Sequence, residues 1–96
     1  MGRTNQPRTE SRMNHPATTL YTKPSCVQCD ATKRDLEKKG VEYTAVDMTK
    51  DPAALDYVKS LGHMQAPVLV IDTPTQPVHW SGYRPDLIKI HYGQAA

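Results

Sequence analysis

The stretch TTLYTKPSCVQC, residues 18–29, is the part of the sequence that indicates the fold most clearly. Residues 18–22 are mostly β-branched or aromatic, which predicts a strand. The two cysteines of the chain, Cys26 and Cys29, follow after a short loop, at the point where a helix is expected to begin. A C-x-x-C pair placed between a strand and a helix is typical of a reactive dithiol in a βαβ unit.

The helix that carries the cysteines is predicted from its two ends. Ser25 and Gln28 have the spacing of a capping box, which puts the N-cap at Ser25 and Cys26 at the first helical position. Lysines in the last turn, followed by Gly40, mark the C-terminal end. The helix is therefore expected over residues 26–39.

Further elements follow along the chain. Asp51 and Pro52 give an N-cap and an N1 proline to a second helix, which Gly62 ends. The apolar run PVLVI predicts a strand that is covered on both faces. The expected strands and the last helix are, in chain order, the strands 41–46, 67–71 and 78–81 and a helix from Pro85 to just before Gly93.

The resulting order, β-α-β-α-β-β-α, predicts one α/β domain. Alternation of strand, helix and strand requires a parallel crossover, whereas the turn chemistry of DTPTQP, residues 72–77, joins the last two strands into an antiparallel hairpin. We therefore expect a four-stranded mixed sheet flanked by three helices, with helices on both faces.

Length and hydropathy restrict the class of protein. The 96 residues suit one small domain. Residues 1–16 are polar and aperiodic, which predicts a flexible N-terminal tail and leaves residues 17–96 as the domain. The chain has no run of about 18 apolar residues and no apolar N-terminal signal, so we expect no membrane association. A cytoplasmic location follows as the expectation, and there thiols stay reduced unless they are in use.

The distribution of charge argues against nucleic-acid binding. The formal net charge of +2 is accounted for by the segment 1–16, and nine basic and nine acidic residues remain from Ala17 onward. Those residues form no cluster of one sign and do not interleave with aromatic residues as a base-stacking surface requires. Nucleic acid is therefore not an expected partner.

The position of the cysteines predicts their order of attack. The first N–H groups of a helix carry the positive end of its dipole and stabilise a thiolate at Cys26, since cysteines in such positions have pKa values of roughly 3.5–7.5. Lys23 adds a positive charge on the same side. Cys29, one turn further into the helix, is then the resolving thiol that opens the mixed disulfide.

Three other interpretations of the cysteine pair stay open at this point. A structural zinc site usually needs four ligands, whereas this chain has one cysteine pair, and His63, His79 and His91 lack ligand spacing. We therefore expect no metal. A disulfide used only as a staple gains little from closing so short a loop. Two unrelated buried thiols at this spacing would be a coincidence.

Three motifs give the chain a resemblance to a known family. The segments TLYTKPSCVQC (19–29), QAPV (65–68) and WSGYRPD (80–86) occur in the order and at the spacing of NrdH-type redoxins, which are glutaredoxin-like proteins of the thioredoxin superfamily. The likeness covers about residues 18–92. It implies a thioredoxin fold and a cis peptide bond at Pro67, facing the cysteines.

The resemblance also implies a function and a set of partners. NrdH-type redoxins take electrons from NADPH through thioredoxin reductase and pass them to class Ib ribonucleotide reductase, the large subunit being the expected partner. The protein is then a monomeric thiol–disulfide oxidoreductase without a bound cofactor. Catalysis falls to Cys26 and Cys29, with Lys23 stabilising the thiolate. The expected partner-binding residues are Gln65, Ala66, Pro67, Trp80, Ser81, Gly82, Tyr83 and Arg84.

Two rival functions remain. Glutathione-binding glutaredoxins usually carry C-P-Y-C, T-V-P and G-G-x-D, where this chain has CVQC, QAP and GYRPD. Tyr83 and Arg84 thus replace the open glycine segment, which speaks against a redoxin recycled by glutathione or another small thiol. The rival of a different class is an adaptor that binds a metal or cluster through its C-x-x-C pair.

Overall fold

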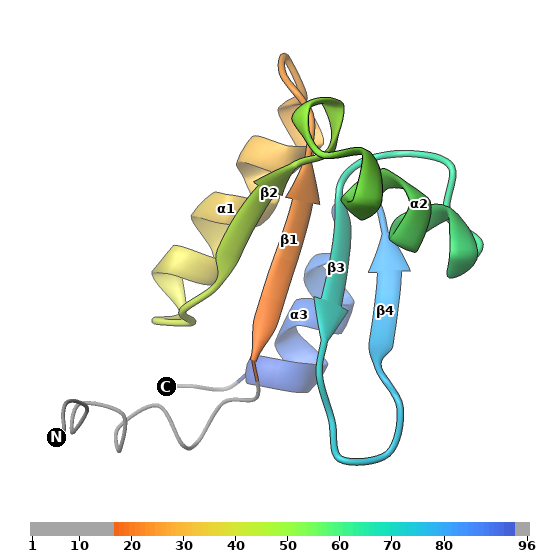
Figure 1. Ribbon diagram of the computed structural model, residues 1–96. Coiled ribbons are helices and arrows are strands. Elements are labelled where there is room, and N and C mark those ends of the chain that lie inside the picture. The colour runs from red at the N-terminus through yellow and green to blue at the C-terminus, as the bar shows by residue number, and fades with distance from the viewer. Residues whose placement is uncertain (1–16, 94–96) are drawn as a thin grey trace, which may run out of the picture.

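A computed structural model describes residues 17–93, and its elements follow the predicted order (Figure 1). The tail predicted over residues 1–16 and the last residues, 94–96, lie outside the described residues. A short 3-10 turn, Met48–Lys50, comes in addition to the predicted elements. The helices and strands are β1 (Thr18–Thr22), α1 (Val27–Lys38), β2 (Thr44–Asp47), α2 (Pro52–Ser60), β3 (Val68–Ile71), β4 (Val78–Ser81) and α3 (Pro85–Tyr92).

The four strands form one mixed sheet in the order β2-β1-β3-β4. β1 pairs with β2 in parallel, as the crossover through α1 requires, and β3 pairs antiparallel with both β1 and β4. Tyr21 and Ser81 both stand opposite Val68, so the ends of β1 and β4 and the start of β3 share one edge of the sheet. The expected four-stranded mixed sheet with three helices, a thioredoxin fold, is confirmed.

Helices cover both faces of the sheet, as predicted, and each face has its own core. α1 and α3 lie on one face and α2 on the other (Figure 1). All four residues of β3 are buried, because this central strand is covered from both sides. The larger cluster contains Leu20, Leu36, Val41, Leu69, Ile71, Trp80, Ile88 and Tyr92. The cluster under α2 contains Met48, Ala54, Val58, Val68 and Val70.

The start of α1 differs from the prediction by one residue. Ser25 is not the N-cap; it has a positive φ of 56° and belongs to the loop. Cys26 is the N-cap, in extended conformation, and its sulfur accepts the Cys29 N–H. A cysteine sulfur thus takes the capping role that the sequence pattern assigned to the hydroxyl of Ser25. Cys26 therefore lies just before the helix rather than at its first helical position.

The prediction of a strand over 41–46 was wrong at its start. Gly40 adopts φ 72° and donates to the carbonyl of Glu37, while Val41 donates to the carbonyl of Leu36. These two bonds are the Schellman motif that closes a helix. Val41 is committed to this cap and to the core beside Leu36, so pairing in β2 begins only at Thr44.

Among the described residues, no helix is long and apolar enough to cross a membrane.

The caps of α2 agree with the sequence pattern, since the side chain of Asp51 accepts the Ala54 N–H and Pro52 is the first helical residue. Gly62, with φ 94°, follows the end of this helix and leads into the segment before β3.

Candidate active site

The two cysteines form a disulfide at the N-terminus of α1, with their Cα atoms 5.2 Å apart. Cys29 is 1% exposed and Cys26 is 9% exposed, so Cys26 lies nearer the surface. The Cys29 N–H donates to the Cys26 sulfur at 3.1 Å. This backbone donor and the helix N-terminus stabilise negative charge on Cys26 when the pair is reduced.

The cis peptide bond lies at the same edge of the sheet. Ala66 and Pro67 are joined by a cis bond, as the resemblance implied. Pro67 directly precedes β3, whose first residue Val68 pairs with Tyr21 near the end of β1. The loop that runs from β1 to Cys26 and the segment before β3 therefore leave the sheet side by side.

The segment after β4 completes this edge. The Gly82 N–H donates to the Pro67 carbonyl at 2.8 Å. The Tyr83 N–H donates to the Gln28 side-chain oxygen at 3.0 Å, which ties the segment to α1. Three segments that are far apart in sequence, namely the C-x-x-C, the cis-proline segment and residues 82–83, are thus joined through hydrogen bonds.

Trp80 and Arg84 take different positions from the rest of this motif. Trp80 is 6% exposed, belongs to the larger core cluster and stacks on His91 with ring centroids 5.5 Å apart. Arg84 is exposed and forms a double hydrogen bond with the carboxylate of Asp86, at 3.1 and 2.9 Å. The guanidinium lowers the pKa of Asp86 from its ordinary value. Trp80 therefore supports the motif from within the core, while Arg84 stands at the surface.

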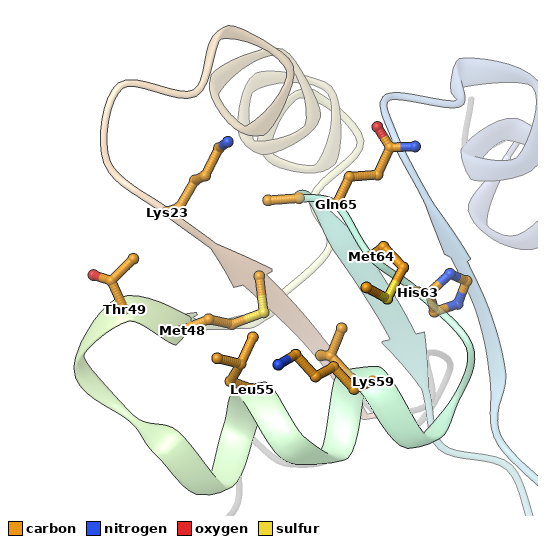
Figure 2. Close-up of a pocket in the computed structure, with 10 residues that line it drawn as sticks. Lys23, Met48, Thr49, Leu55, Lys59, His63, Met64 and Gln65 are labelled. Atoms are coloured by element: carbon orange, nitrogen blue, oxygen red, sulfur yellow. The ribbon is translucent and has the colours of Figure 1, made fainter.

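An apolar groove opens beside the cis-proline segment, with a volume of about 200 Å³ (Figure 2). Gln65 and Ala66 form one side of it and Met64, which is 82% exposed, stands next to them. Two lysines, Lys23 and Lys59, are among the residues that line the groove. The sequence predicted only some of the lining residues as parts of the site. The lining residues are Lys23, Met48, Thr49, Leu55, Val58, Lys59, His63, Met64, Gln65 and Ala66.

His63, which lines the groove, contacts a second histidine, His79 of β4. His63 Nε2 and His79 Nδ1 are 2.8 Å apart, and the rings make an edge-on contact with centroids separated by 4.9 Å. Burial, and then the neighbouring His79, lower the pKa of His63 below its ordinary value of 6.5. The folded chain therefore favours the neutral form of His63.

This contact predicts a loss of stability in mild acid. Unfolding restores the ordinary pKa, so the unfolded chain takes up a proton first and the fold loses stability as the pH falls from about 6.5 through the lowered pKa of His63. Urea unfolding at about pH 7.5 and about pH 5.5, on either side of that value, measures the effect. In His63→Gln, the free energy of unfolding is expected to differ less between the two pH values than in the wild type. An equal difference in both proteins would contradict this interpretation.

Within residues 17–93 there is no group of three or more histidine, cysteine or acidic side chains that could hold a metal ion. His63 and His79 contact each other, whereas His91 stacks on Trp80. Of the three histidines in the described part of the chain, the structure thus brings two together as a pair.

Comparison with known proteins agrees with this geometry. The sequence model of the glutaredoxin family matches residues 18–73. The glutaredoxin-like protein NrdH of Salmonella typhimurium is 41% identical over 70 residues, which cover 73% of this chain and 82% of that protein. The gene 56 protein of Mycobacterium phage L5 is 44% identical over 69 residues, covering 71% of this chain and 64% of that protein.

The structural comparison points the same way. The solved structure of NrdH-redoxin from Escherichia coli superposes with a TM-score of 0.69 at 36% identity, covering 77% of this chain and 92% of that one. The cysteine pair, the fold and these relatives agree with one another. The chain therefore belongs to the glutaredoxin family as an NrdH-type redoxin, a thiol–disulfide oxidoreductase with a redox-active Cys26–Cys29 pair.

Proposed function

We propose that this redoxin carries electrons from NADPH, through thioredoxin reductase, to a class Ib ribonucleotide reductase. The observation that carries the proposal is the convergence of the C-x-x-C, the cis-proline segment and residues 82–83 at one edge of the sheet. The E. coli relative, a glutaredoxin-like protein with a thioredoxin-like activity profile, supports a protein reductase as the electron source. Both expected partners place the chain in the cytoplasm.

The exchange needs only the two cysteines. The Cys26 thiolate attacks the partner's disulfide, forms a mixed disulfide and releases one partner thiolate. Cys29, as a thiolate, then attacks the Cys26 sulfur, which restores the disulfide seen here and releases the second partner thiolate. Two electrons pass to the partner, whose thiolates take up two protons, and the reductase returns two electrons from NADPH. No cofactor needs to stay bound.

The partner docks where the three segments meet. We assign Gln65, Ala66 and Pro67 to partner binding, with the backbone of Ala66 pairing with an extended partner segment, since the Pro67 carbonyl already accepts the Gly82 N–H. Ser81, Gly82 and Tyr83, which are half-buried at and just after the end of β4, form a wall beside the cis-proline segment, to which the Gly82 N–H is hydrogen-bonded. Trp80 supports this wall from the core, and Arg84 lies at its outer rim.

Lys23 is proposed to stabilise the reactive thiolate. It precedes Cys26 in the same loop and is exposed, so its charge acts through solvent. Lys23→Gln is expected to raise the pKa of the reduced Cys26 thiol by on the order of a few tenths of a unit. The pH dependence of alkylation by iodoacetamide measures that pKa; a pKa equal to that of the wild type would remove Lys23 from this role.

A reductase-coupled assay separates the rival functions. Rapid oxidation of NADPH with thioredoxin reductase and a disulfide substrate is expected, while Cys26→Ser provides the matched inactive control. Turnover with glutathione or a similar small thiol alone would favour the glutaredoxin-like rival. Stoichiometric metal or visible absorbance in the purified protein, lost in Cys26→Ser, would favour the adaptor.

A further inference from the structure

Gln28 is one of the two residues between the cysteines, and its side chain extends from α1 to the segment after β4. Its backbone is part of the first turn of α1, where its carbonyl accepts the hydroxyl of Thr32 at 2.9 Å. Its side chain is exposed and reaches a residue 55 positions away, accepting the Tyr83 N–H at 3.0 Å. This hydrogen bond joins the segment between the two cysteines directly to the wall formed by residues 82–83.

The wall is also held from two other directions. The Gly82 N–H donates to the carbonyl of Pro67 at 2.8 Å. The Tyr83 hydroxyl donates to Asp35 at 3.2 Å, and Asp35 also forms an ion pair with Lys39 at 2.5 Å. These contacts fix the wall to the cis-proline segment and to the middle of α1. Among the hydrogen bonds of residues 17–93, the one accepted by Gln28 ties the wall to the turn that bears the cysteines.

The fit around Gly82 shows how closely Gln28 approaches the wall. Gly82 has a φ of 85°, and a Cβ atom built on it would lie 3.3 Å from the Gln28 side-chain oxygen. The absence of a side chain at this position leaves room for the amide to reach the Tyr83 N–H. The Gln28 side-chain oxygen thus both lies close to Gly82 and accepts the Tyr83 N–H.

We infer that Gln28 is a positioning residue for disulfide exchange with protein substrates, because it holds the 82–83 wall at a fixed place relative to the cysteine turn. The inference rests on the proposed function, in which that wall docks the partner. Without the acceptor, the exposed Tyr83 N–H bonds to water, while the contacts from Gly82 and Asp35 keep the segment folded. The partner must then order the wall on binding, which weakens docking but leaves the chemistry of the cysteines unchanged.

A pair of substitutions tests this role. Gln28→Met keeps the length of the side chain and removes the amide oxygen, whereas Gln28→Glu keeps an oxygen acceptor at the same reach. Reduction of insulin, with dithiothreitol as the electron source, gives KM and kcat for a protein disulfide without depending on the reductase. Hydroxyethyl disulfide, which is too small to use the wall, serves as the control substrate.

Gln28→Met is expected to raise KM for insulin by about three- to tenfold, equivalent to 0.6–1.4 kcal/mol, with kcat unchanged. Its rate with hydroxyethyl disulfide and its melting temperature should match the wild type, since the side chain is exposed. Gln28→Glu should restore KM. An unchanged KM in Gln28→Met, or an equal rise in both variants, would overturn the inference.

Failure of the proposed electron route gives a different result. In that case thioredoxin reductase fails to reduce the wild-type chain, while the dithiothreitol assay still separates Gln28→Met from Gln28→Glu. If the wild type reduces hydroxyethyl disulfide but shows no saturable use of insulin, protein docking at the wall is absent, and the inference falls with it.

Discussion

Replacing Cys29 by serine is expected to leave a chain that attacks a disulfide once and then stays joined to its partner. Cys26 lies nearer the surface and accepts the Cys29 N–H, so we expect it to be the sulfur that a partner meets. Without the buried Cys29 thiol, nothing within the chain opens the mixed disulfide. Cys26→Ser instead removes the nucleophile and should lower turnover by roughly a thousandfold or more.

Non-reducing electrophoresis and intact mass of the adduct measure this difference. Cys29→Ser is expected to accumulate a covalent adduct with a disulfide-bearing protein that dithiothreitol releases, and Cys26→Ser to accumulate none. Val27→Ala, at an exposed position between the cysteines, is the matched control that keeps both thiols and should turn over normally. Equal trapping by the two serine variants would contradict the assigned order of attack.

Removing the Leu36 side chain is expected to have the largest effect on stability. Leu36 lies in α1, is 0% exposed and packs in the cluster that contains Leu20, Leu69 and Ile88. Leu36→Ala loses buried apolar contacts and leaves a cavity, which costs about 2–5 kcal/mol in the free energy of unfolding. For a domain of this size the melting temperature should fall by at least about 10 °C.

Thermal unfolding followed by circular dichroism checks this effect. The control is Leu55→Ala on α2, because Leu55 is 36% exposed at the edge of the groove and should change the free energy of unfolding by less than about 0.5–1 kcal/mol. A similar loss in both variants would mean that the face of α1 bearing Leu36 does not form the core.

The elements of the fold follow from local sequence signals. Asp51 and Pro52 predict the start of α2 because a capping carboxylate and a fixed φ act within one turn. The run at 67–71 predicts a strand buried on both faces because only a central strand tolerates such a pattern. The cis bond at Pro67 has no such local signal and was expected only from the resemblance.

Element boundaries shifted where two local solutions compete. At the start of α1, Ser25 and Cys26 both offer a side-chain acceptor, and the structure uses the sulfur, which also lies over the helix N-terminus. At its end, Val41 has β propensity, yet its N–H and side chain complete the helix cap and the core. Propensity alone does not rank such alternatives.

The contacts that shape the site connect residues distant in sequence. Gln28 meets Tyr83 across 55 positions, and His63, which follows α2, meets His79 of β4 across 16 positions. No local pattern marks these pairs, because packing between elements distant in sequence brings them together.

The proposed electron route is tested most directly by reconstituting it. Thioredoxin reductase, NADPH, this redoxin and a class Ib ribonucleotide reductase are combined without another reductant, and deoxyribonucleotide formation is measured. Formation that requires the redoxin, saturates with its concentration and is lost in Cys26→Ser is the predicted result. If the redoxin is active with dithiothreitol in this reaction but inert with thioredoxin reductase and NADPH, or if it supports no deoxyribonucleotide formation at all, the proposed function is wrong.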